Sequence, residues 1–129
     1  MINSPTTIGL TSEMLAGFSS DAEPPCLSLY QPTHRRHPEN QQDPIQFRNL
    51  MKELDASLRQ KYPAAETRLL LKPFEALAHN AEFWNHTLEG LAVLGGPGTF
   101  RALRLPHSVA ELVVVADSFH TKPLRRFLQ

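Results

Sequence analysis

The sequence predicts an α/β domain, with α+β as the alternative, in which a mixed sheet of about four strands is covered by helices. Short apolar or β-branched segments occur at residues 26–30, 90–94, 100–105 and 111–116, and each is typical of a strand. Between the first and second of these segments, apolar residues recur at helical spacing. The expected order α-β-α-α-β-β-β implies one sheet with helices packed on it.

The first elements are short and end at proline. Thr11-Ser12-Glu13 precedes three apolar residues and predicts a short amphipathic helix. Any such helix must end before Pro24-Pro25, because proline lacks the amide donor and restricts the residue before it. Cys26–Tyr30 alternates well enough for a short strand that is buried on one side. Residues 32–42 are polar and rich in proline and predict a loop.

A long helix is predicted to begin at Asp43. Asp43 can cap it, Pro44 suits the first helical position, and Gln46 completes a capping-box pattern. The apolar residues that follow lie on one helical face, and they are Phe47, Leu50, Met51, Leu54 and Leu58. The helix should end at Tyr62-Pro63, because proline restricts the residue before it.

A second helical stretch begins near Ala64. Pro73 interrupts its apolar stripe, so we expect either a kink or two short helices. Asn80 can cap a further turn that contains Phe83 and Trp84, which we expect to cover the core.

The last third predicts strands. Residues 90–94 are expected to form a buried strand, residues 95–98 a glycine-rich turn, and residues 100–105 the returning arm of a hairpin. The β-branched run at residues 111–116 is typical of a central strand. Residues 122–128 are expected to be helical or a linker.

Length and charge limit the function classes. The 129 residues fit one domain, so we expect a single domain over residues 10–129 after a flexible N-terminus at residues 1–9. Thirteen basic and thirteen acidic residues cancel, which argues against general coating of nucleic acid, because that activity requires excess positive charge. A local basic patch remains compatible with this balance.

Cysteine usage and hydropathy indicate the cytoplasm. Cys26 is the only cysteine, so no disulfide can form within the chain and no cysteine-rich zinc site exists. The first residues lack the basic and apolar pattern of a signal peptide. No apolar run approaches the ~20 residues that a membrane span needs. We therefore predict no membrane association, no cofactor and no metal.

His34-Arg35-Arg36-His37 is the first candidate site. The cluster follows a predicted strand and lies shortly before a helix N-terminus, where arginine forks and the partial positive charge of the helix favour phosphate. The alternative is a solvated loop whose arginines pair with Glu39 or Asp43. A zinc site is less favoured, because a catalytic zinc normally needs three protein ligands and only His34 and His37 are close in sequence.

Two further polar groups could carry chemistry. Glu82 and His86 are one helical turn apart and can pair. Asp117-Ser118-Phe119-His120 follows a strand, and its residue types resemble a nucleophile–acid–base set. Such sets are normally assembled from distant parts of a fold, so polar capping of the strand or contact with a following domain is the alternative. Cys26 has no local basic partner and is expected to be a small buried hydrophobe.

Several segments resemble the bacterial proteins related to the archaeo-eukaryotic peptide-chain release factors. The segment 27–35 is similar to the opening strand and loop of that family, and residues 42–50 to the helix that follows. Later blocks that match in order and spacing are Glu82-Phe83-Trp84, Gly90–Val93, Arg104-Leu105-Pro106 and Phe119–Leu124. The resemblance extends from about Leu10 to Leu128.

The resemblance implies an N-terminal, non-catalytic module that contacts the ribosome, tRNA or rRNA in translation termination or ribosome rescue. Full-length members carry further domains, so the downstream domains are expected partners. The Gly-Gly-Gln motif of the family's catalytic domain is absent here, and so is the Asn-Ile-Lys-Ser sequence of its codon-reading loop. Neither activity can therefore be carried over, and Gly95-Gly96-Pro97 is not a substitute.

The residues predicted to contact phosphate are His34, Arg35, Arg36, Arg48 and Lys52, the last two extending the patch along the helix. The second hypothesis is a protein-interaction or structural domain, with Phe119, His120 and Lys122 on the interaction surface beside an exposed apolar patch. A third is a small hydrolase that uses His34 or His120 as base, which would require a carboxylate or hydroxyl beside either ring in a deep pocket.

Overall fold

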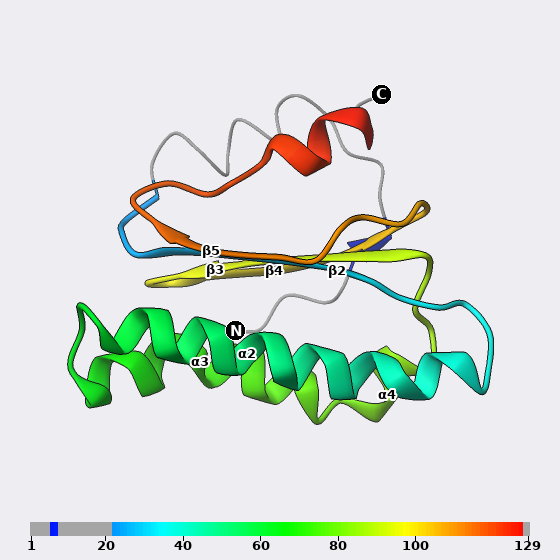
Figure 1. The fold of residues 1–129 in the computed structure, drawn as a ribbon, viewed down its shortest axis with the longest axis horizontal. Coiled ribbons are helices and arrows are strands. Elements are labelled where there is room, and N and C mark those ends of the chain that lie inside the picture. The colour runs from blue at the N-terminus through cyan, green and yellow to red at the C-terminus, as the bar shows by residue number, and fades with distance from the viewer. Residues whose placement is uncertain (1–5, 8–21, 128–129) are drawn as a thin grey trace.

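One mixed sheet separates a layer of α-helices from a short C-terminal helix. The computed structural model of the protein describes residues 6–7 and 22–127. Helices α2, α3 and α4 cover one face of the sheet, and the 3-10 helix η2 lies over the other (Figure 1). The α/β prediction is confirmed. The helix expected at residues 11–18 lies outside the described residues.

The sheet has five strands in the order β1-β4-β3-β2-β5. Their bounds are Thr6–Thr7 for β1, Cys26–Pro32 for β2, Gly90–Gly96 for β3, Thr99–Leu105 for β4 and Leu112–Ala116 for β5. Strand β1 pairs in parallel with β4, and the other neighbours are antiparallel. Sequence analysis missed β1, because two threonines carry no periodicity.

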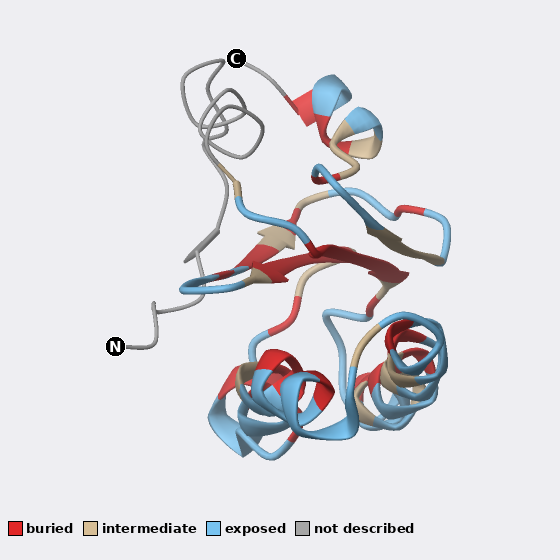
Figure 2. Cartoon of the chain, turned by 90° about the vertical axis from the view of Figure 1, so that its left-hand side faces the viewer, coloured by how far each residue is buried: buried red, intermediate tan, exposed pale blue. Residues whose placement is uncertain are grey.

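Strand β2 is buried on both faces. Leu27 and Leu29 belong to the core beneath the α-helices, whereas Cys26 and Tyr30 belong to a second core beneath η2. The expectation of one buried face is therefore wrong. The physical reason is η2 (Lys122–Phe127), which folds back over a face that the local sequence could not show to be covered (Figure 2).

Helix α2 (Asp43–Arg59) confirms the predicted helix, but its start differs from the expectation. A 3-10 turn, η1 (Glu39–Gln42), continues directly into α2. Gln42 holds the N-cap position with no side-chain cap, and Asp43 is already helical. The capping box does not form either, because Gln46 donates to the Glu111 carboxylate instead. The preceding turn supplies the continuity that a capping side chain would otherwise provide.

Helix α3 (Ala64–Ala78) is continuous, so the alternative of two short helices is wrong. Pro73 lies inside it. A proline removes the hydrogen bond to the carbonyl four residues earlier, which here belongs to Leu69. Leu69 is 71% exposed, so water can satisfy that oxygen. Residues 60–63 join α2 to α3.

The short helix α4 (Ala81–Trp84) confirms the predicted cap and the predicted cover over the core. The Asn80 side chain accepts a hydrogen bond from the Phe83 amide at 3.1 Å. Phe83 and Trp84 are both buried. The Trp84 indole N–H donates to the Leu77 carbonyl at 2.8 Å, which ties α4 to the end of α3.

Strands β3 and β4 form the predicted hairpin, but the prediction for β5 was wrong. Gly96 pairs with Thr99, so the turn consists of Pro97 and Gly98, and Gly98 has the positive φ of 73° that glycine accommodates. Strand β5 pairs only with β2 within the described sheet and is an edge strand rather than a central one. Its valines are half-buried, because α2 packs beneath them.

No helix among the described residues is both long enough and apolar enough to cross a membrane.

Candidate nucleic-acid interface

The exposed faces of α2 and α3 border a groove in which polar side chains surround the apolar residues Met51, Leu71 and Ala78. On α2 the groove residues are Arg48, Lys52, Asp55 and Arg59, and on α3 and its end they are Arg68, Glu75 and His79. Both sets follow helical spacing, so each lies on one side of its helix. Arg48 lies beside Ala78 while Arg59 and Arg68 lie near the connection, so the two helices run antiparallel.

The groove consists of two adjoining hollows. The cationic hollow, about 460 Å³, lies between the two helices and contains the residues named above. The amide hollow, about 390 Å³, lies between the start of α2 and α4, and its polar lining includes Asn40, Gln41 and Asn85. Arg48, Ala78 and His79 line both hollows, so the two are continuous.

The cationic hollow carries an excess of positive charge. Four arginine or lysine side chains line it against the two carboxylates of Asp55 and Glu75, which leaves an excess of two charges with histidine neutral. The Asp55 carboxylate is already paired with Arg59 at 2.9 Å. The chain as a whole has no net charge, so this groove concentrates positive charge locally.

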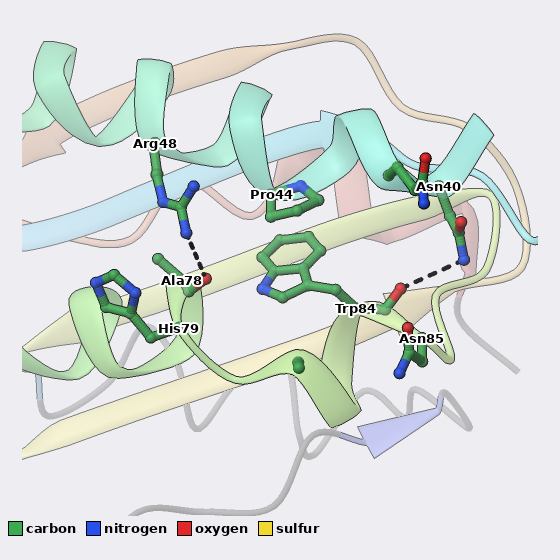
Figure 3. Close-up of a pocket in the computed structure, with 9 residues that line it drawn as sticks. Asn40, Pro44, Arg48, Ala78, His79, Trp84 and Asn85 are labelled. Carbon is green, nitrogen blue, oxygen red and sulfur yellow. Dashed lines mark hydrogen bonds between the residues drawn. The ribbon is translucent and has the colours of Figure 1, made fainter. Parts of the chain in front are cut away.

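Arg48 marks the junction of the hollows. Its guanidinium donates to the Ala78 carbonyl at 3.4 Å and lies close to the His79 ring in Figure 3. The Trp84 indole lies against Pro44 beside it (Figure 3). Arg48 and Lys52 were predicted to contact phosphate, and the structure places both in the groove.

His34 is anchored by the buried Asp43 carboxylate, although half of the His34 side chain is exposed to solvent. Its backbone N–H donates to one oxygen of Asp43 at 2.8 Å, and its Nδ1 lies 2.8 Å from the other. Asp43 is only 2% exposed. The Thr87 hydroxyl donates to the His34 carbonyl at 2.6 Å. These contacts tie the loop at residues 33–38 to the start of α2 and to the segment before β3.

The two arginines of the loop differ. Arg35 forms an ion pair with Glu89 at 2.8 Å and also donates to the Pro106 carbonyl, so the expected pairing with Glu39 or Asp43 is wrong. The guanidinium of Arg36 is exposed and has no ion pair or hydrogen bond with any described residue. None of His34, Arg35 or Arg36 lines either hollow. The structure thus separates the predicted site into a loop and a groove.

The hydrolase alternative lacks a nucleophile at His34. A carboxylate does lie beside the ring, as that alternative required. The Thr87 hydroxyl donates to the backbone carbonyl of His34. Among the described residues, no hydroxyl contacts the remaining ring nitrogen, so the relay from carboxylate through imidazole to hydroxyl is incomplete.

The segment after β5 caps the sheet. The His120 amide donates to the Ser28 hydroxyl at 2.9 Å, and the Tyr30 hydroxyl donates to the His120 carbonyl. Burial raises the pKa of Tyr30 above its ordinary range, consistent with a phenol held as a donor. Burial, and then the Asp117 carboxylate, raise the pKa of the Cys26 thiol, which disfavours the nucleophilic thiolate.

Three of the large apolar side chains expected in an exposed patch near η2 are buried instead. Phe119, Leu124 and Phe127 are all buried at 8% exposure or less, because they form the core beneath η2. His120 is half-buried and Lys122 is exposed. Beside Lys122 there is a hollow of about 390 Å³ whose lining includes the apolar residues Val109, Ala110, Leu112 and Pro123. Among the described residues, no group of three or more histidine, cysteine or carboxylate side chains could hold a metal ion.

Sequence analysis missed the α3 side of the groove. Arg68, Glu75 and His79 recur at i, i+7 and i+11, and Arg48, Asp55 and Arg59 have the same spacing on α2. That matching periodicity is a usable signal for two polar stripes. It does not say that the stripes lie side by side, which depends on the turn between the helices.

Neither a known protein family nor a curated protein matches this chain in sequence comparisons.

Proposed function

We propose that the protein is a non-catalytic RNA-contacting module of the translation machinery, resembling the N-terminal domain of release-factor-like proteins, and that the groove between α2 and α3 contacts RNA phosphates. The observation that carries the proposal is the local excess of positive charge in a hollow between two helices of a neutral chain. Arginine forks and lysine ammonium groups are the usual protein ligands of phosphate. The resemblance supplies the partner class, which is tRNA, rRNA or the ribosome in the cytoplasm.

The loop contributes less than the groove. Arg35 already has Glu89 as a partner, and His34 is tied to Asp43. Arg36 is exposed and has no such partner among the described residues, so it is the loop residue best able to add a phosphate contact. In this proposal Arg48 and Lys52 carry the binding and Arg36 extends it.

The test is binding of tRNA and of ribosomes by Arg48→Ala/Lys52→Ala. Each lost phosphate contact should flatten the dependence of log K on log salt by about 1, so the double variant should bind more weakly with a slope about 2 units shallower. The matched control is Lys61→Ala/Lys72→Ala, which removes the same charge from two exposed lysines outside the groove.

A second comparison separates the two parts of the predicted site. Arg35→Ala/Arg36→Ala should reduce affinity less than the groove variant, because Arg35 is already paired. Equal affinity and equal salt slope for the groove variant and the wild-type protein would refute the phosphate role of the groove.

A further inference from the structure

We propose that the amide hollow receives an unstacked base of single-stranded RNA, while the backbone of that strand follows the cationic hollow. This inference rests on the proposed function, because it names the class of RNA that the same groove would take. It is carried by the different chemistry of two hollows that meet at Arg48.

The lining of the amide hollow suits a flat heterocycle better than a phosphate. Pro44, Ala78 and the edge of Trp84 provide apolar surface. The side chains of Asn40, Gln41 and Asn85 are amides. Asn40 is buried and its amide nitrogen already donates to the Trp84 carbonyl at 3.5 Å, whereas Gln41 and Asn85 are exposed, and each carries both donors and an acceptor. A base edge presents the same mixture, and single-stranded RNA is recognised through such edges. A phosphate would instead require several cations, and the amide hollow has Arg48 as its only arginine or lysine.

The positions of the polar groups within the hollow are also suitable. Figure 3 shows Arg48 and His79 at one end and Asn40 and Asn85 at the other, with Trp84 and Pro44 between them. Arginine planes and histidine rings are common stacking partners for unstacked bases. A base between the two ends could therefore stack at one side and form hydrogen bonds at the other.

Arg48 can serve the base and the backbone together. Its hydrogen bond to the Ala78 carbonyl holds the guanidinium at the boundary of the hollows. The guanidinium has five N–H donors and two flat faces, so it can stack on a base while it donates to a neighbouring phosphate. Lys52, Arg59 and Arg68 continue the positive charge away from that point. A strand with one base in the amide hollow would thus lead its phosphates into the cationic hollow.

The volume of the amide hollow is consistent with a small heterocycle. About 390 Å³ lies in the range of roughly 300–1,000 Å³ typical of small-molecule sites. Duplex RNA cannot use such a hollow, because its bases are paired and stacked inside the helix. The inference therefore predicts a preference for single strands.

Trp84 provides a direct readout, since it is the only tryptophan of the chain and lines the hollow. The experiment titrates the full chain with three 12-nucleotide probes: a single-stranded RNA, an abasic strand with the same number of phosphates, and a duplex of the same length. The single strand should change Trp84 fluorescence and bind about ten-fold more tightly than the abasic strand, a difference typical of base stacking and base contacts. The duplex should leave the fluorescence unchanged.

Variants with matched controls locate the effect. His79→Ala and Asn85→Ala should each weaken binding of the single strand several-fold and leave the abasic strand unaffected. His86→Ala and Asn49→Ala replace exposed residues of the same types outside the hollow and should bind both strands as the wild-type protein does. Far-UV circular dichroism on each variant verifies that the fold is retained.

The outcomes distinguish this inference from the proposed function. Equal affinity for the single strand and the abasic strand, with unchanged Trp84 fluorescence, would overturn the base site. The proposed function would still stand in that case if Arg48→Ala/Lys52→Ala weakens the binding of both strands. If that double variant binds every RNA as well as the wild-type protein, both proposals fail. An acidic peptide is the third outcome. If such a peptide displaces the RNA and changes Trp84 fluorescence, and RNA alone leaves that fluorescence unchanged, the amide hollow binds peptide and the base site is overturned.

Discussion

The carboxylate of Asp43 organises the polar contacts between the loop and the helices. It is 2% exposed, and it accepts hydrogen bonds from the amide and the ring of His34 and from the Thr87 hydroxyl at 3.4 Å. The Gln31 side-chain amide donates to the backbone carbonyl of Asp43 at 3.2 Å. One buried acid therefore joins the end of β2, the loop at residues 33–38 and the segment before β3.

Asp43→Asn should destabilise the protein by about 2–3 kcal/mol, because hydrogen bonds to a charged acceptor are lost and one buried donor is left without an acceptor. Equilibrium urea unfolding at pH 7 measures the change. Asp117→Asn is the matched control, since Asp117 is exposed, and it should change the stability by no more than about 0.5 kcal/mol. Coincident unfolding curves for Asp43→Asn and the wild-type protein would contradict the structural role of this carboxylate.

Tyr30 provides a second prediction at the residue scale. Its hydroxyl donates to the His120 carbonyl, and burial raises its pKa. In the unfolded chain the phenol ionises near pH 10, whereas in the folded chain it stays protonated to higher pH. A raised folded-state pKa means that this contribution to stability is complete below about pH 10 and is lost as the pH rises above it.

Tyr30→Phe should therefore be less stable than the wild-type protein by about 1 kcal/mol at pH 7, and the gap should narrow above pH 10. Urea unfolding at pH 7, 9 and 10.5 measures the difference in stability between Tyr30→Phe and the wild-type protein. The other titrating groups contribute equally to both proteins, so their contribution cancels in this difference. Tyr62→Phe is the control, because it keeps Tyr30 and should therefore lose stability above pH 10 as the wild-type protein does. A gap that stays constant from pH 7 to 10.5 would show that the hydroxyl is not buried as the structure has it.

At the scale of elements, α3 packs on the sheet through an aromatic cluster that needs a glycine opposite it. Phe74 is fully buried and lies between Phe47 and Phe100, with ring centroids 6.5 and 5.1 Å away. A Cβ at Gly95 on β3 would come within 2.6 Å of the Phe74 ring. The close approach of α3 to the hairpin of β3 and β4 therefore depends on this position.

Gly95→Ala should cost about 1–3 kcal/mol, because a buried ring confined by two others must shift to admit the methyl group. Thermal and urea unfolding measure the loss. In a Phe74→Leu background, the same substitution should cost less, because the branched side chain leaves more room, so the double-mutant cycle should show a coupling of at least about 0.5 kcal/mol. Additive losses would refute the direct contact.

The elements show which predictions a local pattern can carry. The helix α2, the Asn80 cap of α4 and a glycine-rich turn after residue 94 were predicted from residues adjacent in sequence, since a proline or an asparagine cap acts within one turn. The predicted Asp43 cap of α2 was wrong. Strand β5 was wrongly predicted to be a central strand. A run of valines is typical of a central strand, but it occurs equally in an edge strand that has one face covered by a helix. The continuity of α3 through Pro73 could not be decided from the proline alone.

At the scale of the whole molecule, a neutral chain concentrates positive charge in the groove between α2 and α3. The thirteen acidic residues balance the basic ones, yet four basic side chains face two carboxylates in the cationic hollow. Long-range attraction of RNA should therefore be weak, and binding should depend on the few phosphates that reach the groove.

The dependence of log K on log salt for single-stranded RNA should have a slope of about −2. Arg59 is paired with Asp55, and the other three groove cations, Arg48, Lys52 and Arg68, can release counterions from about three phosphates at ~0.7 per contact. Fluorescence anisotropy between 50 and 250 mM salt measures this slope. A slope near −8 would require a far larger basic surface than the groove and would contradict the assignment. A slope near zero would indicate that phosphates contribute nothing.

The sequence by itself determined the class of fold, the helix α2, the Asn80 cap of α4, the hairpin and two of the groove cations, Arg48 and Lys52. Only the tertiary structure decided that η2 buries the second face of β2, that the buried Asp43 carboxylate anchors His34, and that the polar stripes of α2 and α3 adjoin. The reason is that helical and turn signals arise from neighbouring residues, whereas these contacts join residues 9 to 92 positions apart. Such contacts depend on how the layers pack, which no local pattern records.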